Sequence, residues 1–274
     1  MRRLLLTLAV VVAVVVAAPA AVAAPAPVPT SMGAIGDSLS LGFNACGGSG
    51  SCLDVSWSTG AGTDHPDFAS HYTRLAAIEP GLVGQVVNAA VPGSPVAAIA
   101  GQVATLAPNA PDYVTILIGG ADVCKPSIDL MTPVDEFRAS FREGLAALRE
   151  QIPAARVLAV SIPDVVSILD AVRERPGIES SFFASYCASV YANPYSDAKA
   201  DRHRRAAARR RIERFNSAIA AECARDRLCR TDRGALFRHR WIDAEVSADF
   251  LHPSITGQQM MADVTFAAGW RWAP

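Results

Sequence analysis

Residues 32–40 read MGAIGDSLS, a short apolar run that stops at Gly36 and continues into Asp37 and Ser38. An apolar run bounded by a turn residue is typical of a buried strand, and glycine permits a sharp backbone turn after it. Strand-like apolar runs occur at residues 32–35, 83–88, 113–118, 157–161 and, more weakly, near 235–238. The sequence therefore predicts five strands, the first of which leads directly into Asp37 and Ser38.

Helical patterns separate these runs. They cover residues 67–77, 95–106, 133–151, 198–226 and 254–268. Strands that alternate with helices predict a mostly parallel sheet covered on both faces, a three-layer α/β/α sandwich of the α/β class. The segment 163–200 contains Pro176, Gly177 and Pro194, so we predict that it is irregular and held by Cys187. Sites in such folds lie beyond the carboxyl ends of the strands.

The N-terminus has the pattern of an export signal. Residues 4–18 read LLLTLAVVVAVVVAA, follow Arg2 and Arg3, and lead into small residues and prolines. We predict a signal peptide over residues 1–23, a proline-rich leader without a packing pattern over 24–30, and one domain over 31–274. An uncleaved membrane anchor is the alternative, although the apolar run is short for a hydrocarbon core of ~30 Å. We therefore expect a secreted, extracellular protein.

Composition restricts the class of protein. The chain has 274 residues, of which 51% are hydrophobic and 19% charged, and this suffices for one domain with a full core. Loss of Arg2 and Arg3 with the signal changes the net charge from −1 to −3, which does not favour nucleic acid as a partner. The sequence has no H-E-x-x-H motif, phosphate-binding loop or G-x-S-x-G elbow. We expect a monomer that needs no metal or other cofactor.

Six cysteines lie in the predicted mature part. An even number in an exported chain predicts three disulfides. The two C-x5-C spacings favour Cys46–Cys52 and Cys223–Cys229 as local loops, which leaves Cys124–Cys187 as the third pair. A structural zinc site is the alternative, but the chain has no C-x2-C element and no histidine at ligand spacing.

Ser38 is a candidate nucleophile. At the start of a helix after the first strand, its hydroxyl would lie near free backbone N–H groups and a positive helix end, which suit an anionic intermediate. An ordinary N-cap serine is the alternative interpretation. A serine becomes nucleophilic when a base accepts its proton, so the histidines decide between the two.

His252 is the candidate base. We expect His203 and His239, which lie among arginines, at the surface, and we predict no role for His65 and His71. By contrast, His252 follows a carboxylate by three residues in the sequence Asp249-Phe250-Leu251-His252-Pro253. In a tight turn, Asp249 can accept a hydrogen bond from one ring nitrogen while the other nitrogen faces the serine.

Four segments together resemble a known family. Gly36-Asp37-Ser38-Leu39-Ser40 resembles the first signature block of the SGNH/GDSL hydrolases, and Asp249-Phe250-Leu251-His252-Pro253 resembles the last. Between them, Asn88-Ala89-Ala90-Val91-Pro92-Gly93 resembles the second block and Ile118-Gly119-Gly120-Ala121-Asp122 the third. The resemblance implies the flavodoxin-like SGNH fold and a serine esterase or lipase with catalytic Ser38, Asp249 and His252. Within that family, the chain most resembles the exported actinobacterial-type esterases and lipases with three disulfides.

The third block departs from the family pattern. The resemblance implies oxyanion donors on the backbone of Ser38 and Gly93, and an asparagine side chain where this chain has Ala121. Loss of one such donor costs about 10²–10³ in kcat. A backbone N–H in the Gly119-Gly120 turn or the side chain of Asn44 is a candidate replacement. Alternatively, the chain is a degenerate member that binds an acylated lipid or cell-wall component without turning it over.

Three further features have less specific interpretations. Asp37 and Asp122, beside the glycine turns, are predicted to hold those loops by hydrogen bonds. Phe250 and Leu251 either line an acyl pocket or pack under the last helix. Residues 201–214 contain seven arginines, and contact with an anionic lipid surface or cell-wall polymer is one interpretation. We favour a solvated helix whose apolar stripe turns inward, with the stripe formed by Ala208, Ile212, Phe215 and Ile219.

Overall fold

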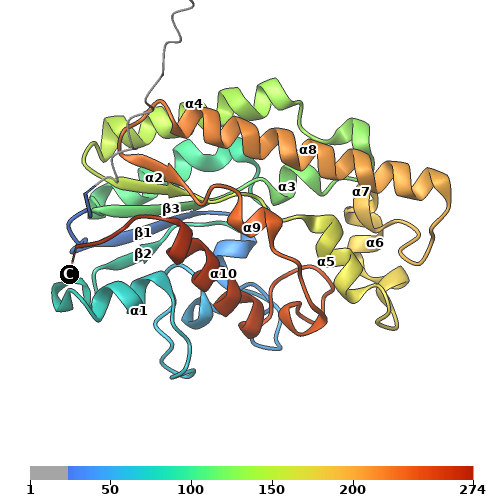
Figure 1. Cartoon of the computed structure of the whole chain (residues 1–274), viewed down its shortest axis with the longest axis horizontal. Helices are drawn as coiled ribbons and strands as arrows, with labels where there is room; N and C mark the ends of the chain where they lie inside the picture. The colour runs from blue at the N-terminus through green and yellow to red at the C-terminus, as the bar shows by residue number, and fades with distance from the viewer. Residues whose placement is uncertain (1–23, 274) are drawn as a thin grey trace, which may run out of the picture.

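A five-stranded parallel sheet forms the centre of the computed structural model, which describes residues 24–273 (Figure 1). Its strands are β1 (Met32–Gly36), β2 (Val86–Asn88), β3 (Tyr113–Leu117), β4 (Arg156–Ala159) and β5 (Cys229–Thr231). The order across the sheet is β2-β1-β3-β4-β5, and every pairing is parallel. All residues of β1 and β3 are buried, as expected when both faces of a sheet are covered. The predicted signal peptide lies outside the described residues.

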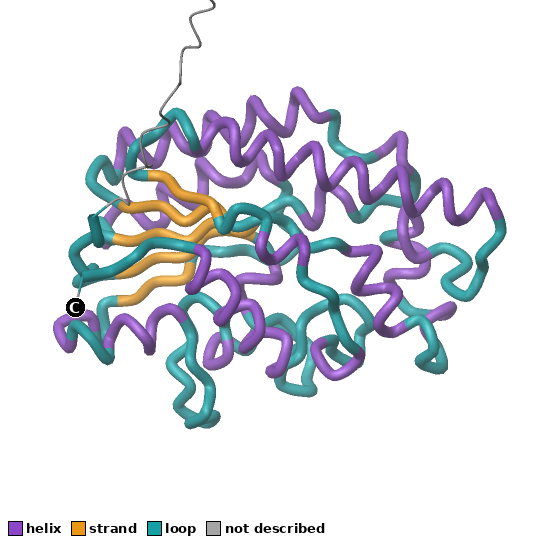
Figure 2. Tube along the Cα trace, in the orientation of Figure 1, coloured by secondary structure: helices purple, strands orange, loops and turns teal. Residues whose placement is uncertain are grey.

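Helices cover both faces of the sheet (Figures 1 and 2). One layer is formed by α2 (Ile99–Leu106), α4 (Val134–Gln151) and α8 (Lys199–Cys223), and the other contains α1 (His71–Ala76) and α10 (Ile255–Ala268). The predicted three-layer sandwich is therefore confirmed. Both α1 and α2 begin four residues later than predicted, and α1 begins at His71 because the Ser70 hydroxyl caps its first turn.

The fifth strand was predicted in the wrong place. Residues 235–238 form a single helical turn, α9 (Ala235–Arg238), and the strand lies earlier, at β5. The reason is local. The Asp232 carboxylate accepts hydrogen bonds from the backbone N–H groups of Gly234 (3.1 Å) and Leu236 (2.8 Å). These bonds stabilise a helical turn at residues 235–238, where the apolar side chains indicated a strand.

The segment 163–200 is more regular than predicted. It contains α5 (Val165–Val172), α6 (Phe182–Tyr186) and α7 (Ala188–Tyr191), and the short α3 (Gly120–Val123) lies near them at the end of β3. Asp164 caps α5 by accepting the N–H of Val166. The sequence of α5 is rich in valine and isoleucine, which have low helix propensity, so packing in the core overrides the local preference.

The arginine-rich helix α8 has the predicted inward stripe. Ala208, Ile212, Phe215 and Ile219 are all buried. Several of its arginines bind within the chain. Arg209 lies 3.1 Å from the carboxylate of Asp164, and Arg211 donates to the carbonyl of Thr132 at 2.7 Å.

The leader also differs from its prediction. Residues 24–30 were expected to lack packing, but Ala26 is buried and forms a parallel bridge with Trp272. Its N–H donates to Arg271 and its carbonyl accepts from Ala273, both at 2.7 Å. The leader and the last residues of the chain therefore pair with each other.

Three disulfides are present, Cys46–Cys52, Cys124–Cys187 and Cys223–Cys229. Within residues 24–273, no helix combines the length and the apolar character needed to cross a bilayer.

Candidate active site

The candidate nucleophile lies where the strand order reverses. β1 lies between β2 and β3, and ligands of open parallel sheets bind at such a switch point. β1 ends at Gly36, whose φ is 149°, and a Cβ there would lie 2.1 Å from the carbonyl oxygen of Leu117. Only glycine fits this position, so the backbone turns sharply and Ser38 begins a short 3-10 helix.

Two buried side chains fix this turn. The amide of Gln102, on α2, accepts from the N–H of Gly36 (2.7 Å) and donates to its carbonyl (2.8 Å). Asp37 accepts the N–H groups of Leu39 (3.0 Å) and Gly120 (3.1 Å), as predicted for a loop-holding carboxylate. Asp122 has the same role, because it accepts from the Val96 N–H (2.9 Å). The β1 and β3 turns are therefore joined by hydrogen bonds.

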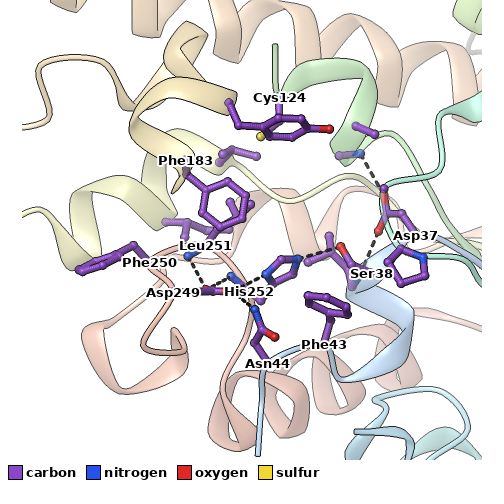
Figure 3. Close-up of a pocket in the computed structure, with 18 of the residues that line it drawn as sticks. Asp37, Ser38, Phe43, Asn44, Cys124, Phe183, Asp249, Phe250, Leu251 and His252 are labelled. Carbon is purple, nitrogen blue, oxygen red and sulfur yellow. Dashed lines mark hydrogen bonds and ion pairs between the residues drawn. The ribbon is translucent and has the colours of Figure 1, made fainter. Parts of the chain in front are cut away.

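Ser38, His252 and Asp249 lie in contact (Figure 3). The Nε2 atom of His252 lies 2.8 Å from the Ser38 Oγ, and its Nδ1 lies 2.5 Å from the Asp249 Oδ2. A carboxylate accepts only, so we assign the ring proton to Nδ1, which leaves Nε2 free to accept from the serine. Residues more than two hundred positions apart thus form the arrangement that activates a serine.

Asp249 is held as a carboxylate. Its Oδ1 accepts the N–H groups of Leu251 (3.0 Å) and His252 (2.9 Å), while its Oδ2 accepts from Asn44 Nδ2 at 2.6 Å. Burial raises the pKa of Asp249, but the hydrogen bonds from His252, Asn44 and Leu251 outweigh burial and hold the pKa below its usual value. The group that faces His252 is therefore ionised at neutral pH.

The residues predicted for the oxyanion hole lie together at the cavity. Ser38, Gly93 and Ala121 all line one cavity, and within the described part of the chain no acceptor bonds to their N–H groups. The two candidate replacements for the missing asparagine make other contacts or lie outside the cavity. The N–H of Gly120 donates to Asp37, while Gly119 does not line the cavity, and the Asn44 amide is bound to Asp249 and Gly50.

A mostly apolar cavity of about 600 Å³ opens beside Ser38 (Figure 3). Its size is within the range of small-molecule sites. None of its lining residues is a lysine or an arginine, and its carboxylates, Asp37 and Asp249, are bound within the protein. Phe250 and Leu251 line it, together with Phe43, Ile162, Val165, Ile168, Phe182 and Phe183. The cavity therefore suits an uncharged aliphatic group.

Comparison with known proteins now decides the family. The profile of the GDSL-like lipase/acylhydrolase family matches residues 34–260, which include all four signature blocks. The chain belongs to this family. The resemblance seen in the sequence is thus confirmed, and the chain is a hydrolase of the lipase or esterase type.

Solved structures with the same fold include two from Streptomyces. One is an extracellular lipase from Streptomyces rimosus, with 16% identity, a TM-score of 0.51, and coverage of 87% of this chain and 99% of that one. The other is a phospholipase A1 from Streptomyces albidoflavus NA297, with 16% identity, a TM-score of 0.52 and the same coverage. No curated protein matches the chain. At such low identity these structures show a shared GDSL hydrolase fold.

None of the other four histidines of this GDSL hydrolase, His65, His71, His203 and His239, lines the cavity beside Ser38. His71 is a core residue between the Tyr113 hydroxyl (3.0 Å) and the Thr265 hydroxyl (2.8 Å), and burial lowers its pKa to about 3. His203 is exposed, as predicted. His239 is partly buried, contrary to prediction, because its Nε2 contacts the buried Glu245 at 2.8 Å. In the described part of the chain, no cluster of side chains suits a metal ion.

Two supporting residues were missed or misassigned from the sequence. Gln102 gave no signal, because a glutamine in an ordinary helix does not reveal a contact 66 residues away. Asn44 was considered, but as an oxyanion donor. Its position six residues after Ser38 placed it near the site without indicating which group it contacts.

Asp37 provides a test of this hydrogen-bonded turn. Burial raises its pKa from 3.8 to about 6, although the N–H groups of Leu39 and Gly120 oppose the rise. Between these values the folded protein holds more protons than the unfolded chain, so this group's contribution to stability falls as pH rises through the window. Asparagine does not titrate, so the unfolding free energy of Asp37→Asn minus that of wild type should rise by up to about 3 kcal/mol between about pH 4 and pH 6. A difference in stability that is the same at every pH does not affect this rise.

Urea unfolding of both proteins at several pH values measures this difference. Titrating groups that do not interact with Asp37 cancel in the comparison because both proteins contain them, and the nearby charges of His252 and Asp122 affect Asp37 less than its burial does. A difference that stays flat, or that falls as pH rises, would contradict a buried acid at position 37.

Proposed function

We propose that the chain is a secreted serine esterase that hydrolyses carboxylic esters through an acyl-Ser38 intermediate. The observation that carries the proposal is the 2.8 Å contact between His252 Nε2 and Ser38 Oγ, with Asp249 on the other ring nitrogen. Family membership supports a lipase or esterase. The export pattern at residues 1–23 and three disulfides support secretion.

The reaction follows from the arrangement of these groups. His252 accepts the proton of Ser38 as its Oγ attacks the ester carbonyl. The N–H groups of Ser38 and Gly93 stabilise the resulting oxyanion, and the protonated His252 then gives its proton to the leaving alcohol. Water, activated by His252, attacks the acyl-enzyme and releases the acid. Asp249 keeps the imidazole oriented and stabilises its charged form.

The apolar cavity favours binding of an aliphatic acyl chain over binding of the sugar part of a carbohydrate ester. Each methylene removed from water contributes about 0.8 kcal/mol, whereas sugar hydroxyls would lose hydrogen bonds to water against these walls. We therefore expect kcat/KM to rise with acyl chain length until the cavity is filled.

Labelling with a serine-directed fluorophosphonate tests the proposal. The reagent forms a stable bond only with an activated serine, so mass spectrometry should find one adduct, on Ser38. A panel of p-nitrophenyl esters of increasing acyl length should be hydrolysed by the same preparation. If Ser38 is neither labelled nor needed for turnover, a binding module for an acylated lipid or cell-wall component becomes the better description.

A further inference from the structure

A small loop closed by a disulfide lies directly beside Asp249. The loop runs from Asn44 to Cys52 and is closed by the Cys46–Cys52 bond. The N–H of Asn44 donates to the carbonyl of Gly50, and the N–H of Gly50 donates to Asn44 Oδ1, both at 2.8 Å. The N–H of Cys52 donates to the carbonyl of Leu41 (3.1 Å), at the end of the helical turn that begins with Ser38.

The loop presents one side chain to Asp249. Asn44 Nδ2 donates to Asp249 Oδ2 at 2.6 Å, across 205 residues of sequence (Figure 3). This is the same oxygen that faces His252 Nδ1. The φ of Asn44 is 58°, a left-handed conformation that asparagine tolerates better than most residues. With its Oδ1 bound to Gly50, the amide is fixed at both ends.

The two oxygens of Asp249 are held by different parts of the molecule. Oδ1 is bound by backbone N–H groups of its own turn, at Leu251 and His252. Among the described residues, Oδ2 is bound by His252 and Asn44 alone. Asn44 is thus the contact that ties the oxygen facing the imidazole to the segment that carries the nucleophile.

We infer that Asn44 is a positioning residue for Asp249 and that the Cys46–Cys52 disulfide keeps it in place. The inference rests on the proposed function, because it assigns a task within the same catalytic site. Asn44 acts through Asp249 and does not touch the reacting atoms.

Two substitutions at residue 44 separate the side chain from the backbone. Asn44→Gly removes the amide while suiting the positive φ, and Asn44→Asp keeps the size but replaces the donor by an acceptor. With Asn44→Gly, kcat should fall about tenfold or more, the factor for one hydrogen bond to a charged group, with little change in KM. With Asn44→Asp, kcat should also fall, and the acid limb of the kcat/KM profile should move to higher pH because a second carboxylate stabilises the protonated imidazole.

The other groups that influence this profile are the same in all variants. Around His252 and Asp249 they are Asp37 after β1, Tyr191 on α7, and Arg175, whose guanidinium donates to the Ser247 carbonyl at 2.8 Å. A residue that served only folding would lower the amount of active protein without lowering kcat per folded molecule in Asn44→Gly.

The chain contains a matched control for the disulfide. Cys223–Cys229 has the same sequence separation of 6 and joins the end of α8 to β5, and neither cysteine lines the cavity. The double variant Cys46→Ser/Cys52→Ser should lower kcat in the direction of Asn44→Gly, by a smaller factor. The double variant Cys223→Ser/Cys229→Ser should lower the unfolding temperature and leave kcat per folded molecule unchanged.

The outcomes distinguish this inference from the proposed function. If wild type hydrolyses esters but both Asn44 variants retain its kcat and acid limb, Asn44 does not position Asp249. If wild type neither turns over nor labels at Ser38, the proposed function fails, and the inference is then decided by the downfield proton resonance of His252 Nδ1–H. That resonance should shift in Asn44→Gly relative to wild type, and an unchanged resonance would overturn the inference.

Discussion

Ser38→Ala is expected to lower kcat for ester hydrolysis by about 10⁴- to 10⁶-fold, to a rate that reflects binding and oxyanion stabilisation alone. The reason is that the proposed covalent step has no other nucleophile: the hydroxyl at 2.8 Å from His252 Nε2 is the atom that attacks. Initial rates on a p-nitrophenyl ester, with protein concentration corrected for folded fraction, give the ratio. The substitution removes one partly exposed hydroxyl, so the unfolding temperature should stay close to that of wild type.

His252→Ala provides the matched comparison. When two groups act as one unit, removal of either costs nearly as much as removal of both. The kcat of the double variant Ser38→Ala/His252→Ala should therefore lie within a small factor of the kcat of the less active single variant. Hydrolysis that survives in Ser38→Ala at a rate near wild type would exclude the acyl-serine mechanism.

Ala121→Asn is expected to raise kcat by about tenfold to a hundredfold, part of the 10²–10³ that one oxyanion-hole donor supplies. Ala121 lines the cavity beside Ser38 and Gly93, so a longer side chain at this position extends into the space where the oxyanion forms. Since the donor acts on the transition state more than on the bound ester, KM should change little. Steady-state kinetics on the preferred ester measure both quantities.

Ala121→Leu is the control for this substitution. Leucine has the same branched shape as asparagine and somewhat more bulk but no donor, so it should give no gain in kcat. If Asn and Leu behave alike, the hole is already complete without a side chain at this position. The backbone N–H of Ala121, which has no acceptor among residues 24–273, would then be the third donor.

The sequence predicted the centre of this molecule better than its edges. Ser38 and His252 lie in short sequence motifs, a glycine turn before a serine and an aspartate three residues before a histidine. Both residues could therefore be predicted from the sequence alone. β5 was misplaced because it has three residues, one of them Arg230, and carries almost no apolar signal. α5 was missed because VVSILDAV has the composition of a strand, and its helical form depends on the core around it.

The support of the site was the least predictable part. Gln102 and Asn44 act through single hydrogen bonds to groups 66 and 205 residues away. Such contacts leave no periodic pattern, because one polar side chain at one position satisfies them. Only the folded arrangement shows that the Gly36 turn is held by Gln102 on α2 and that Asp249 is held by Asn44, from the segment that follows Ser38.

The Cys124–Cys187 bond has a consequence for substrate choice. Cys124 ends the helical turn that carries Ala121, and Cys187 separates α6 from α7, so the covalent link joins two segments that both contribute residues to the cavity wall. The spacing of these two parts of the wall is therefore constrained before a ligand binds, and little conformational entropy should be lost there on binding. We therefore expect the cavity to accept slender acyl groups more readily than branched or bulky ones.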